Sequence, residues 1–172
     1  QEQREDLVDV LLVCGANTNP KNVADWTPLH FAAFLGNLRI ASRLIEAQGI
    51  SIDALTNSLL TPLHLALEKG HEKIARLLVQ SGASLSAKAQ NGWTALFFAV
   101  YEGNANVVDL LLRAEEGLVD LVDSEGRNAL HIASSRGHRE LISVLLARGL
   151  HIESKSISGR TPLHFAAESG SV

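Results

Sequence analysis

The sequence predicts an all-α-dominated repeat solenoid, and a recurring motif, its regular spacing and an aliphatic composition support this prediction. Thr-Pro-Leu-His occurs at residues 27–30, 61–64 and 161–164, and looser copies start at Thr94 and Asn128. The five starts are 34, 33, 34 and 33 residues apart. A unit of this length cannot bury its own apolar face and must stack on its neighbours. Aromatic residues make up only 5% of the 172 residues, which favours a core of helical aliphatic residues.

Each unit is expected to begin with a short helix. The helix follows a capping Thr or Asn, and three copies place Pro at the first helical position, where no backbone N–H is needed. A glycine nine residues after each cap predicts the end of this helix. These glycines are Gly36, Gly70, Gly103, Gly137 and Gly170. Small residues on the helix, such as Ala32 and Ala33, allow close approach of the neighbouring helix.

A second, Leu-rich helix is expected to follow in each unit. In the first complete unit its apolar face contains Leu38, Ala41, Leu44 and Ile45, at helical spacing. A second set of glycines is expected to end these helices: Gly15, Gly49, Gly82, Gly117 and Gly149. A third set, two residues before a cap, predicts the tip of a tight hairpin turn: Gly92, Gly126 and Gly159.

These residues together resemble the ankyrin repeat. The resemblance rests on Thr-Pro-Leu-His, a following Ala pair, Gly-His or Gly-Asn, a Leu-rich helix and Gly-Ala, and it covers essentially the whole chain. It implies two antiparallel helices with a β-hairpin projecting at a right angle, stacked into a gently curved solenoid. It also implies that the motif histidine joins the hairpin to the first helix through hydrogen bonds.

The repeat period predicts how the chain is organised. We expect a single ankyrin-repeat array over residues 1–172, with four complete repeats flanked by two half repeats. The complete repeats are 22–55, 56–88, 89–122 and 123–155; residues 1–21 are the second half of a repeat and 156–172 the first half of another. Neither end shows the clear polar outer face of a terminal repeat, so the sequence predicts a fragment of a longer chain.

Charge and composition exclude several classes of partner. The formal net charge is −4 and there is no run of Lys or Arg, so nucleic acid and anionic membranes are not expected partners. No apolar stretch approaches the length of a membrane span. The single cysteine, Cys14, cannot form an internal disulfide. We therefore expect an intracellular protein, cytoplasmic rather than nuclear.

The histidines are expected to be structural rather than catalytic. His30, His64, His131 and His164 each occupy the same position in a different repeat, so they cannot converge on a metal ion. Catalytic and phosphate-binding motifs are also missing from the sequence. We expect no enzyme activity, no metal, no cofactor and no small-molecule substrate.

Function is therefore expected to lie on an exposed surface. The resemblance places hairpin tips and first helices along the concave groove, which we expect to bind a partner protein or peptide. The candidate residues are Trp26, Phe34, Leu35, Leu59, Leu60, Trp93 and Tyr101, which are apolar or aromatic, and Arg127, Arg136 and Arg160. Aromatic and Arg side chains are frequent hot spots at interfaces. We expect an apolar segment of the partner along Trp26 to Tyr101 and acidic groups at the arginines.

Two alternatives remain open from the sequence. The first concerns the aromatic residues. Each Trp stands directly before a capping Thr and can pack over its hairpin, and Phe34 can pack between first helices, so that these residues have a purely structural role.

The second concerns the function of the array. It can be a scaffold or adaptor in its own right, or a regulatory or autoinhibitory part of a larger enzyme, channel or effector. Fold alone does not choose between these functions.

Overall fold

The computed structural model describes residues 2–170, and it divides them between two compact units, residues 1–84 and 85–172. Residue 1 and residues 171–172, the outer ends of the two predicted half repeats, lie outside the described residues, as do the side chains of residues 2–6. The described part of the chain is helical and contains no β-strand. The predicted repeat architecture is confirmed.

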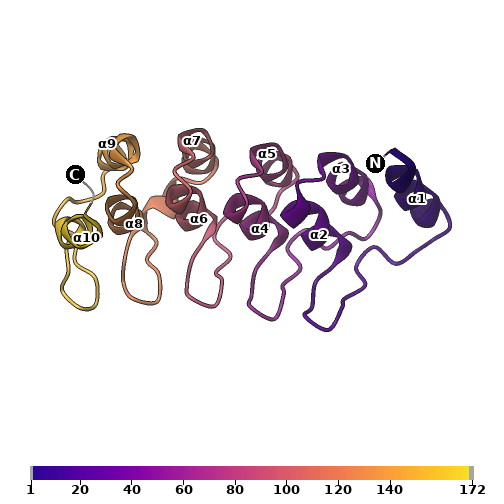
Figure 1. Cartoon of the computed structure of the whole chain (residues 1–172), viewed down its shortest axis with the longest axis horizontal. Coiled ribbons are helices and arrows are strands. Elements are labelled where there is room, and N and C mark those ends of the chain that lie inside the picture. Colours follow the sequence, from indigo (N-terminus) through magenta and orange to yellow (C-terminus); the bar gives the residue numbers. More distant parts are fainter. Residues whose placement is uncertain (1, 171–172) are drawn as a thin grey trace. The chain divides into compact units, whose positions relative to one another are not determined.

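The first unit contains two complete helix pairs and one unpaired helix. The helices are α1 (Glu2–Val13), α2 (Pro28–Leu35), α3 (Leu38–Glu46), α4 (Pro62–Glu68) and α5 (Glu72–Gln80). Within this unit the first helices α2 and α4 pack side by side, and α1, α3 and α5 form a second row (Figure 1). Among the described residues, α1 is a second helix for which no first helix is seen.

The second unit repeats this arrangement. Its helices are α6 (Ala95–Tyr101), α7 (Ala105–Ala114), the short 3-10 helix η1 (Glu116–Asp120), α8 (Ala129–Arg136), α9 (Arg139–Ala147) and α10 (Pro162–Ser169). The first helices α6, α8 and α10 lie in one row within this unit, and α7 and α9 pair with α6 and α8 (Figure 1). The helix α10 is the first helix of a further repeat, and no second helix follows it among the described residues.

The core of each unit follows from the motif. The Leu two residues after each cap is fully buried in all four complete repeats. The residues are Leu29, Leu63, Leu96 and Leu130. Burial of apolar area at roughly 25 cal/mol per Å² makes these leucines, with the Leu-rich second helices, the main source of cohesion between neighbouring elements.

The caps agree with the sequence in most repeats but not in the third. The Thr61 hydroxyl accepts a hydrogen bond from the backbone N–H of His64 (3.3 Å), and the Asn128 side chain accepts one from His131 N–H (3.2 Å). The buried hydroxyl of Thr94 has no hydrogen-bond partner within residues 2–170. The third repeat carries a fully buried Phe97 in place of the motif histidine, so no imidazole is available to Thr94.

The hairpin segments are tight turns without strands in the described chain; in one of them Ala89 N–H donates to Trp93 O (2.8 Å) and Gly92 N–H to Ala89 O (2.8 Å). One local expectation from the sequence is wrong: Gly117 does not end a second helix. Helix α7 stops at Ala114, and Gly117 lies inside η1 without a positive φ. Leu118, fully buried, holds this extra turn against the core.

Candidate partner-binding surface

The first unit carries an N-terminal aromatic cluster formed by Trp26, Phe31 and Phe34. The ring centroid of Trp26 lies 5.0 Å from that of Phe31 and 5.4 Å from that of Phe34, the latter in an edge-on arrangement. These spacings are those of favourable aromatic pairs. Trp26 and Phe34 are half-buried and Phe31 is exposed. The cluster therefore packs on α2 and still presents aromatic surface to solvent.

Hydrogen bonds in the hairpin fix the position of Trp26. The side-chain oxygen of Asn22 accepts from the backbone N–H groups of Ala24 and Trp26, both at 2.9 Å. The Asn22 N–H in turn donates to Trp26 O at 3.1 Å. These bonds hold the backbone that carries the indole, so the cluster is preorganised rather than supported by a mobile loop.

The other predicted apolar residues of this unit occupy two places. Leu35 ends α2 with 70% of its surface exposed, and it lines, with Trp26 and Phe34, a hollow of about 400 Å³. Leu59 and Leu60 lie in the next hairpin and do not line this hollow. Leu59 is exposed and has a positive φ of 58°, whereas Leu60 is half-buried.

The second unit carries an equivalent C-terminal aromatic cluster formed by Trp93, Phe98 and Tyr101. The Trp93 centroid lies 5.3 Å from both the Phe98 and Tyr101 centroids. The indole N–H of Trp93 donates to the Asp123 carboxylate (3.3 Å). Trp93 is half-buried and Tyr101 exposed. Both tryptophans thus have a packing role, as the structural alternative expects, and neither is sealed inside the chain.

A cation covers the outer aromatic ring of each cluster. Lys69 Nζ lies 4.8 Å from the ring centre of Phe34, and the guanidinium carbon of Arg136 lies 4.3 Å from that of Tyr101. Lys69 and Arg136 both follow their caps by eight residues. Such contacts contribute about 0.5–1 kcal/mol at exposed sites. Each unit therefore joins an aromatic surface to a positive charge supplied by the following repeat.

The three predicted arginines differ in how much of their charge is already paired. Arg127 donates to Asp123 through Nε and Nη2, both at 2.7 Å, and the Asp123 side chain is completely buried. Arg160 pairs with Glu168 and lies over the Phe165 ring. Arg136 is exposed and contacts no carboxylate within the described residues. Of the three arginines, Arg136 alone has no carboxylate partner among residues 2–170.

Two of the motif histidines, His30 and His131, act as the resemblance implied. His30 Nδ1 accepts from the backbone N–H of Thr27 (3.1 Å), which leaves Nε2–H to donate to Leu60 O in the next hairpin (3.1 Å). His131 bonds in the same way to Arg160 O (3.1 Å). Burial lowers the pKa of both His30 and His131, against an opposing effect of the backbone carbonyl groups. These imidazoles are therefore neutral structural links.

Two further features of the described residues bear on the kind of site. No three His, Cys, Asp or Glu side chains gather in a metal-binding group within residues 2–170. None of the helices in this part of the chain is long and apolar enough to cross a membrane.

Sequence reasoning missed two residues of the surface, Phe31 and Lys69. Phe31 was hidden because its position is apolar in every repeat, a pattern that normally indicates core. Lys69 is recognisable only when the repeats are aligned. It then occupies the same position as Arg136, and it follows Phe34 in the sequence at the same distance as Arg136 follows Tyr101. An alignment of the repeats on one another identifies Lys69, whereas no signal in the sequence identifies Phe31.

Comparison with known proteins agrees with the fold and the motifs. A family model described as ankyrin repeats (3 copies) matches residues 1–89, 86–156 and 116–172. The chain belongs to the ankyrin-repeat family, whose members generally act as non-catalytic protein-interaction modules.

Several curated relatives are similar over most of the chain. It is 37% identical over 153 residues to B-cell lymphoma 3 protein of Homo sapiens, covering 85% of the chain and 34% of the relative. It is 32% identical over 148 residues to Rabankyrin-5 of Mus musculus, with 84% and 13% covered. It is 32% identical over 157 residues to the nuclear factor NF-kappa-B p105 subunit of Gallus gallus, with 88% and 16% covered. The chain spans about a third or less of each relative.

Proposed function

We propose that this chain is a protein-interaction scaffold that binds a partner protein or peptide through its hairpin tips and first helices. The observation that carries the proposal is the recurrence of an aromatic cluster topped by a cation, Phe34 with Lys69 and Tyr101 with Arg136. Family membership supports a binding role, and the proposal assigns no reaction to the chain.

The N-terminal aromatic cluster is suited to an apolar side chain of the partner. Trp26, Phe34 and Leu35 line a hollow of about 400 Å³ that is mostly apolar in composition. The hairpin bonds of Asn22 hold the indole in place before a partner binds, which limits the entropy lost on association. Aromatic residues that are rigid and partly exposed are typical interface anchors.

The C-terminal aromatic cluster is suited to an apolar side chain followed by a carboxylate. Trp93 and Tyr101 provide the apolar surface, and Arg136 provides an exposed guanidinium without an internal carboxylate partner. Because Arg127 and Arg160 are paired with Asp123 and Glu168, we assign the acidic contact to Arg136 first. An Arg–carboxylate bond is charge-assisted and directional.

Peptide selection followed by titration tests the proposal. Random peptides displayed on phage are selected on the chain, and enriched peptides are titrated by calorimetry and by tryptophan fluorescence, since Trp26 and Trp93 are the only tryptophans. The expected peptides are apolar and acidic. Arg136→Glu should weaken their binding by about tenfold or more, equivalent to at least about 1.4 kcal/mol.

A matched variant separates the site from overall charge. Arg139→Glu makes the same charge change at an exposed position of α9 outside the cluster. Peptides that bind the two variants equally, or a failure to enrich any peptide, would contradict the proposal. Thermal unfolding of both variants confirms that the fold is retained.

A further inference from the structure

The two aromatic clusters recur with a period of 67 residues, which is two repeats, rather than with the single-repeat period of the core. In each unit the earlier repeat supplies the aromatic side chains, and the later repeat supplies the cation that covers the outer ring. The equivalent residues are Trp26 and Trp93, Phe34 and Tyr101, and Lys69 and Arg136. Each unit therefore carries one copy of a surface that is built from two repeats.

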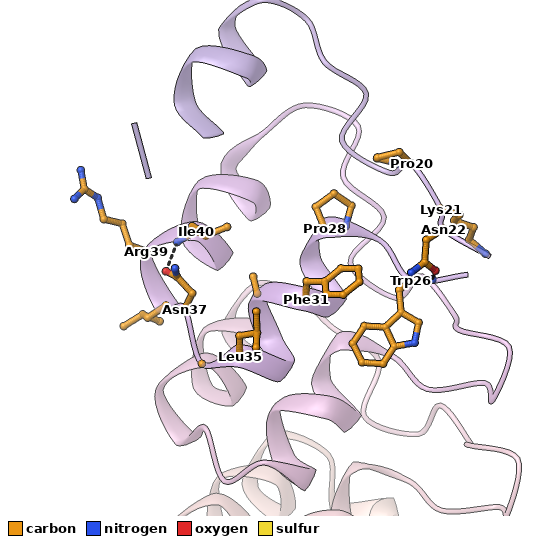
Figure 2. A pocket seen from close by; sticks show the side chains of 13 residues that line it. Pro20, Lys21, Asn22, Trp26, Pro28, Phe31, Leu35, Asn37, Arg39 and Ile40 are labelled. Carbon is orange, nitrogen blue, oxygen red and sulfur yellow. Dashed lines mark hydrogen bonds between the residues drawn. The ribbon is translucent and has the colours of Figure 1, made fainter. Parts of the chain in front are cut away.

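The aromatic parts of the two copies have matching geometry. The Trp26 centroid lies 5.0 Å from that of Phe31 and 5.4 Å from that of Phe34, and both distances are 5.3 Å in the C-terminal aromatic cluster. Figure 2 shows the Trp26 indole next to the Phe31 ring. The aromatic frame is therefore similar in both units, and the groups beside it are where the two copies differ.

A histidine in the later repeat fixes each turn that bears the cation. His71 Nε2–H donates to Phe34 O at 3.1 Å. His138 Nε2–H donates in the same way to Tyr101 O at 3.0 Å. Each imidazole lies so close to a glycine of the preceding repeat that a Cβ there would meet it at 2.6 or 2.7 Å. The turn that carries the cation is thus fastened to the residue whose ring the cation covers.

The residue directly before the cation differs between the two copies. It is Glu68 in the first unit and Ser135 in the second. The Glu68 carboxylate accepts a hydrogen bond from Lys69 Nζ at 3.1 Å. The Ser135 hydroxyl instead donates to Ile132 O within its own helix (2.9 Å), and Arg136 has no carboxylate partner within residues 2–170. The cation of the first copy is neutralised by its own neighbour, whereas that of the second is not.

We propose that this residue, Glu68 or Ser135, decides whether each surface accepts an acidic side chain of a bound peptide. The inference rests on the proposed function, because it takes both aromatic clusters as peptide-binding surfaces. Glu68 occupies Lys69 and repels an incoming carboxylate, so the first surface takes a neutral apolar segment. Ser135 leaves Arg136 available, so the second surface takes an apolar segment followed by Asp or Glu.

The exposure of the Glu68–Lys69 pair makes it suited to setting a preference. The side chains of Glu68 and Lys69 are 40% and 36% exposed, so water and salt screen their attraction and the pair adds little to the stability of the fold. A bound peptide can exclude that water, and the local charge then affects its binding. Exchange of this one residue is therefore expected to change the preference of the surface while the fold is retained.

The other charged difference between the two copies acts in the opposite direction. The residue after the outer ring is Leu35 in the first unit and Glu102 in the second, and both are exposed. A carboxylate at position 102 disfavours an acidic peptide at the second surface. Control by this residue would give the reverse order of the two surfaces, so the measured order distinguishes it from control by Glu68 and Ser135.

Reciprocal substitution, followed by NMR titration, tests the proposal. The probe is the acidic peptide most enriched on the wild-type chain, compared with a copy in which Asn and Gln replace its Asp and Glu. The indole N–H resonances of Trp26 and Trp93, the only tryptophans, report separately on the two surfaces. In the wild type the acidic peptide is expected to shift the Trp93 resonance at the lower concentration, whereas the neutral copy is expected to show no such order.

Each exchange is expected to change the affinity of one surface for the acidic peptide. Glu68→Ser should strengthen binding at Trp26 by about fivefold, and Ser135→Glu should weaken binding at Trp93 by about fivefold, the upper range for an exposed ion pair. The affinity for the neutral copy should change little in either variant. In the double variant the acidic peptide is expected to shift the Trp26 resonance first.

Matched variants separate the position from the charge. Glu46→Ser removes a carboxylate that is also paired, with Arg43 at 3.5 Å, and Ser143→Glu adds one at an exposed position of α9. Ser135→Gln changes the size of the residue without its charge. All three are expected to bind the acidic peptide like the wild type, and thermal unfolding checks that each variant is folded.

The outcomes distinguish this inference from the proposed function. A wild type that binds the acidic peptide with an affinity unaffected by Ser135→Glu, or one that gains nothing at Trp26 from Glu68→Ser, would overturn the inference and leave peptide binding in place. Equal effects of Ser143→Glu and Ser135→Glu would overturn it as well. A wild type that binds no peptide would contradict the proposed function and this inference together.

Discussion

The imidazole of His30 bonds to the carbonyl oxygen of Leu60, thirty residues away, and so joins the first helix of one repeat to the hairpin of the next. His131 makes the same link to Arg160 within the second unit. At His30, Nδ1 accepts from the backbone N–H of Thr27, so the Nε2–H that donates to Leu60 O belongs to a neutral imidazole.

Stability is expected to fall as the pH decreases below about 6.5. Burial lowers the pKa of His30 and His131 in the folded chain, whereas the unfolded chain takes up these protons near pH 6.5. The unfolded state then binds more protons, and the free energy of unfolding decreases. Urea midpoints measured between about pH 7.5 and about pH 5.5 should decline.

A phenylalanine variant checks that these groups cause the decline. The third repeat already holds Phe97 at the motif position, so His131→Phe is a substitution that the fold accommodates elsewhere. This variant should show a smaller decline in midpoint over the same pH range. An identical decline would assign the effect to other groups.

The hydroxyl groups of Thr61 and Thr94 are expected to differ in their contribution to stability. The Thr61 hydroxyl accepts the N–H of His64, so Thr61→Val should lower the free energy of unfolding by about 0.5–2 kcal/mol. The Thr94 hydroxyl is buried without a partner in the described chain, so Thr94→Val should be neutral or stabilising. Urea unfolding of the two variants measures the difference; equal losses would contradict the cap assignments.

Leu59 is expected to be a strained position. Its φ of 58° lies in the left-handed region, and the equivalent positions in three other hairpins hold Gly92, Gly126 and Gly159. Leu59→Gly should therefore raise the free energy of unfolding by up to about 1 kcal/mol, the gain being reduced by the entropy of glycine in the unfolded chain.

Asp25→Gly provides the comparison for this effect. Asp25 occupies the same hairpin position with a φ of 59°, but aspartate tolerates this conformation better than leucine. Its gain should be smaller than that of Leu59→Gly when both are measured by thermal unfolding. A larger gain at Asp25 would show that backbone strain does not control these positions.

The sequence predicted the helix pairs because they depend on local signals that recur every 33 or 34 residues. The histidine links were implied by the resemblance to the ankyrin repeat. The sequence could not predict the pairing of Arg127, because the partner, Asp123, is a buried carboxylate whose environment exists only after the hairpin folds. It could not predict the contact of Lys69 either, because Phe34 belongs to the preceding repeat and the two side chains meet only when the repeats stack. The end of α7 was misjudged because burial of Leu118 outweighs the glycine signal at Gly117.

Gly92 and Gly82 provide a test of what the hairpin contacts contribute. Both have a positive φ, +80° and +84°, so Ala at either position bears the same backbone strain of roughly 1–2 kcal/mol. A Cβ at Gly82 meets nothing within 4 Å, whereas one at Gly92 lies 2.6 Å from the backbone nitrogen of Ser124. That nitrogen donates to Asn91 O (3.2 Å), so Gly92→Ala must also displace the next hairpin.

Gly92→Ala is therefore expected to be the more destabilising of the two substitutions. Urea unfolding followed by tryptophan fluorescence measures both losses, and Trp93, next to Gly92, should report the displaced hairpin as a changed folded-state emission. Gly82→Ala is expected to leave that emission unchanged, because its surroundings are open. Equal losses in the two variants would mean that contact between neighbouring hairpins, including the bond from Ser124 N–H to Asn91 O, adds nothing beyond the turn itself.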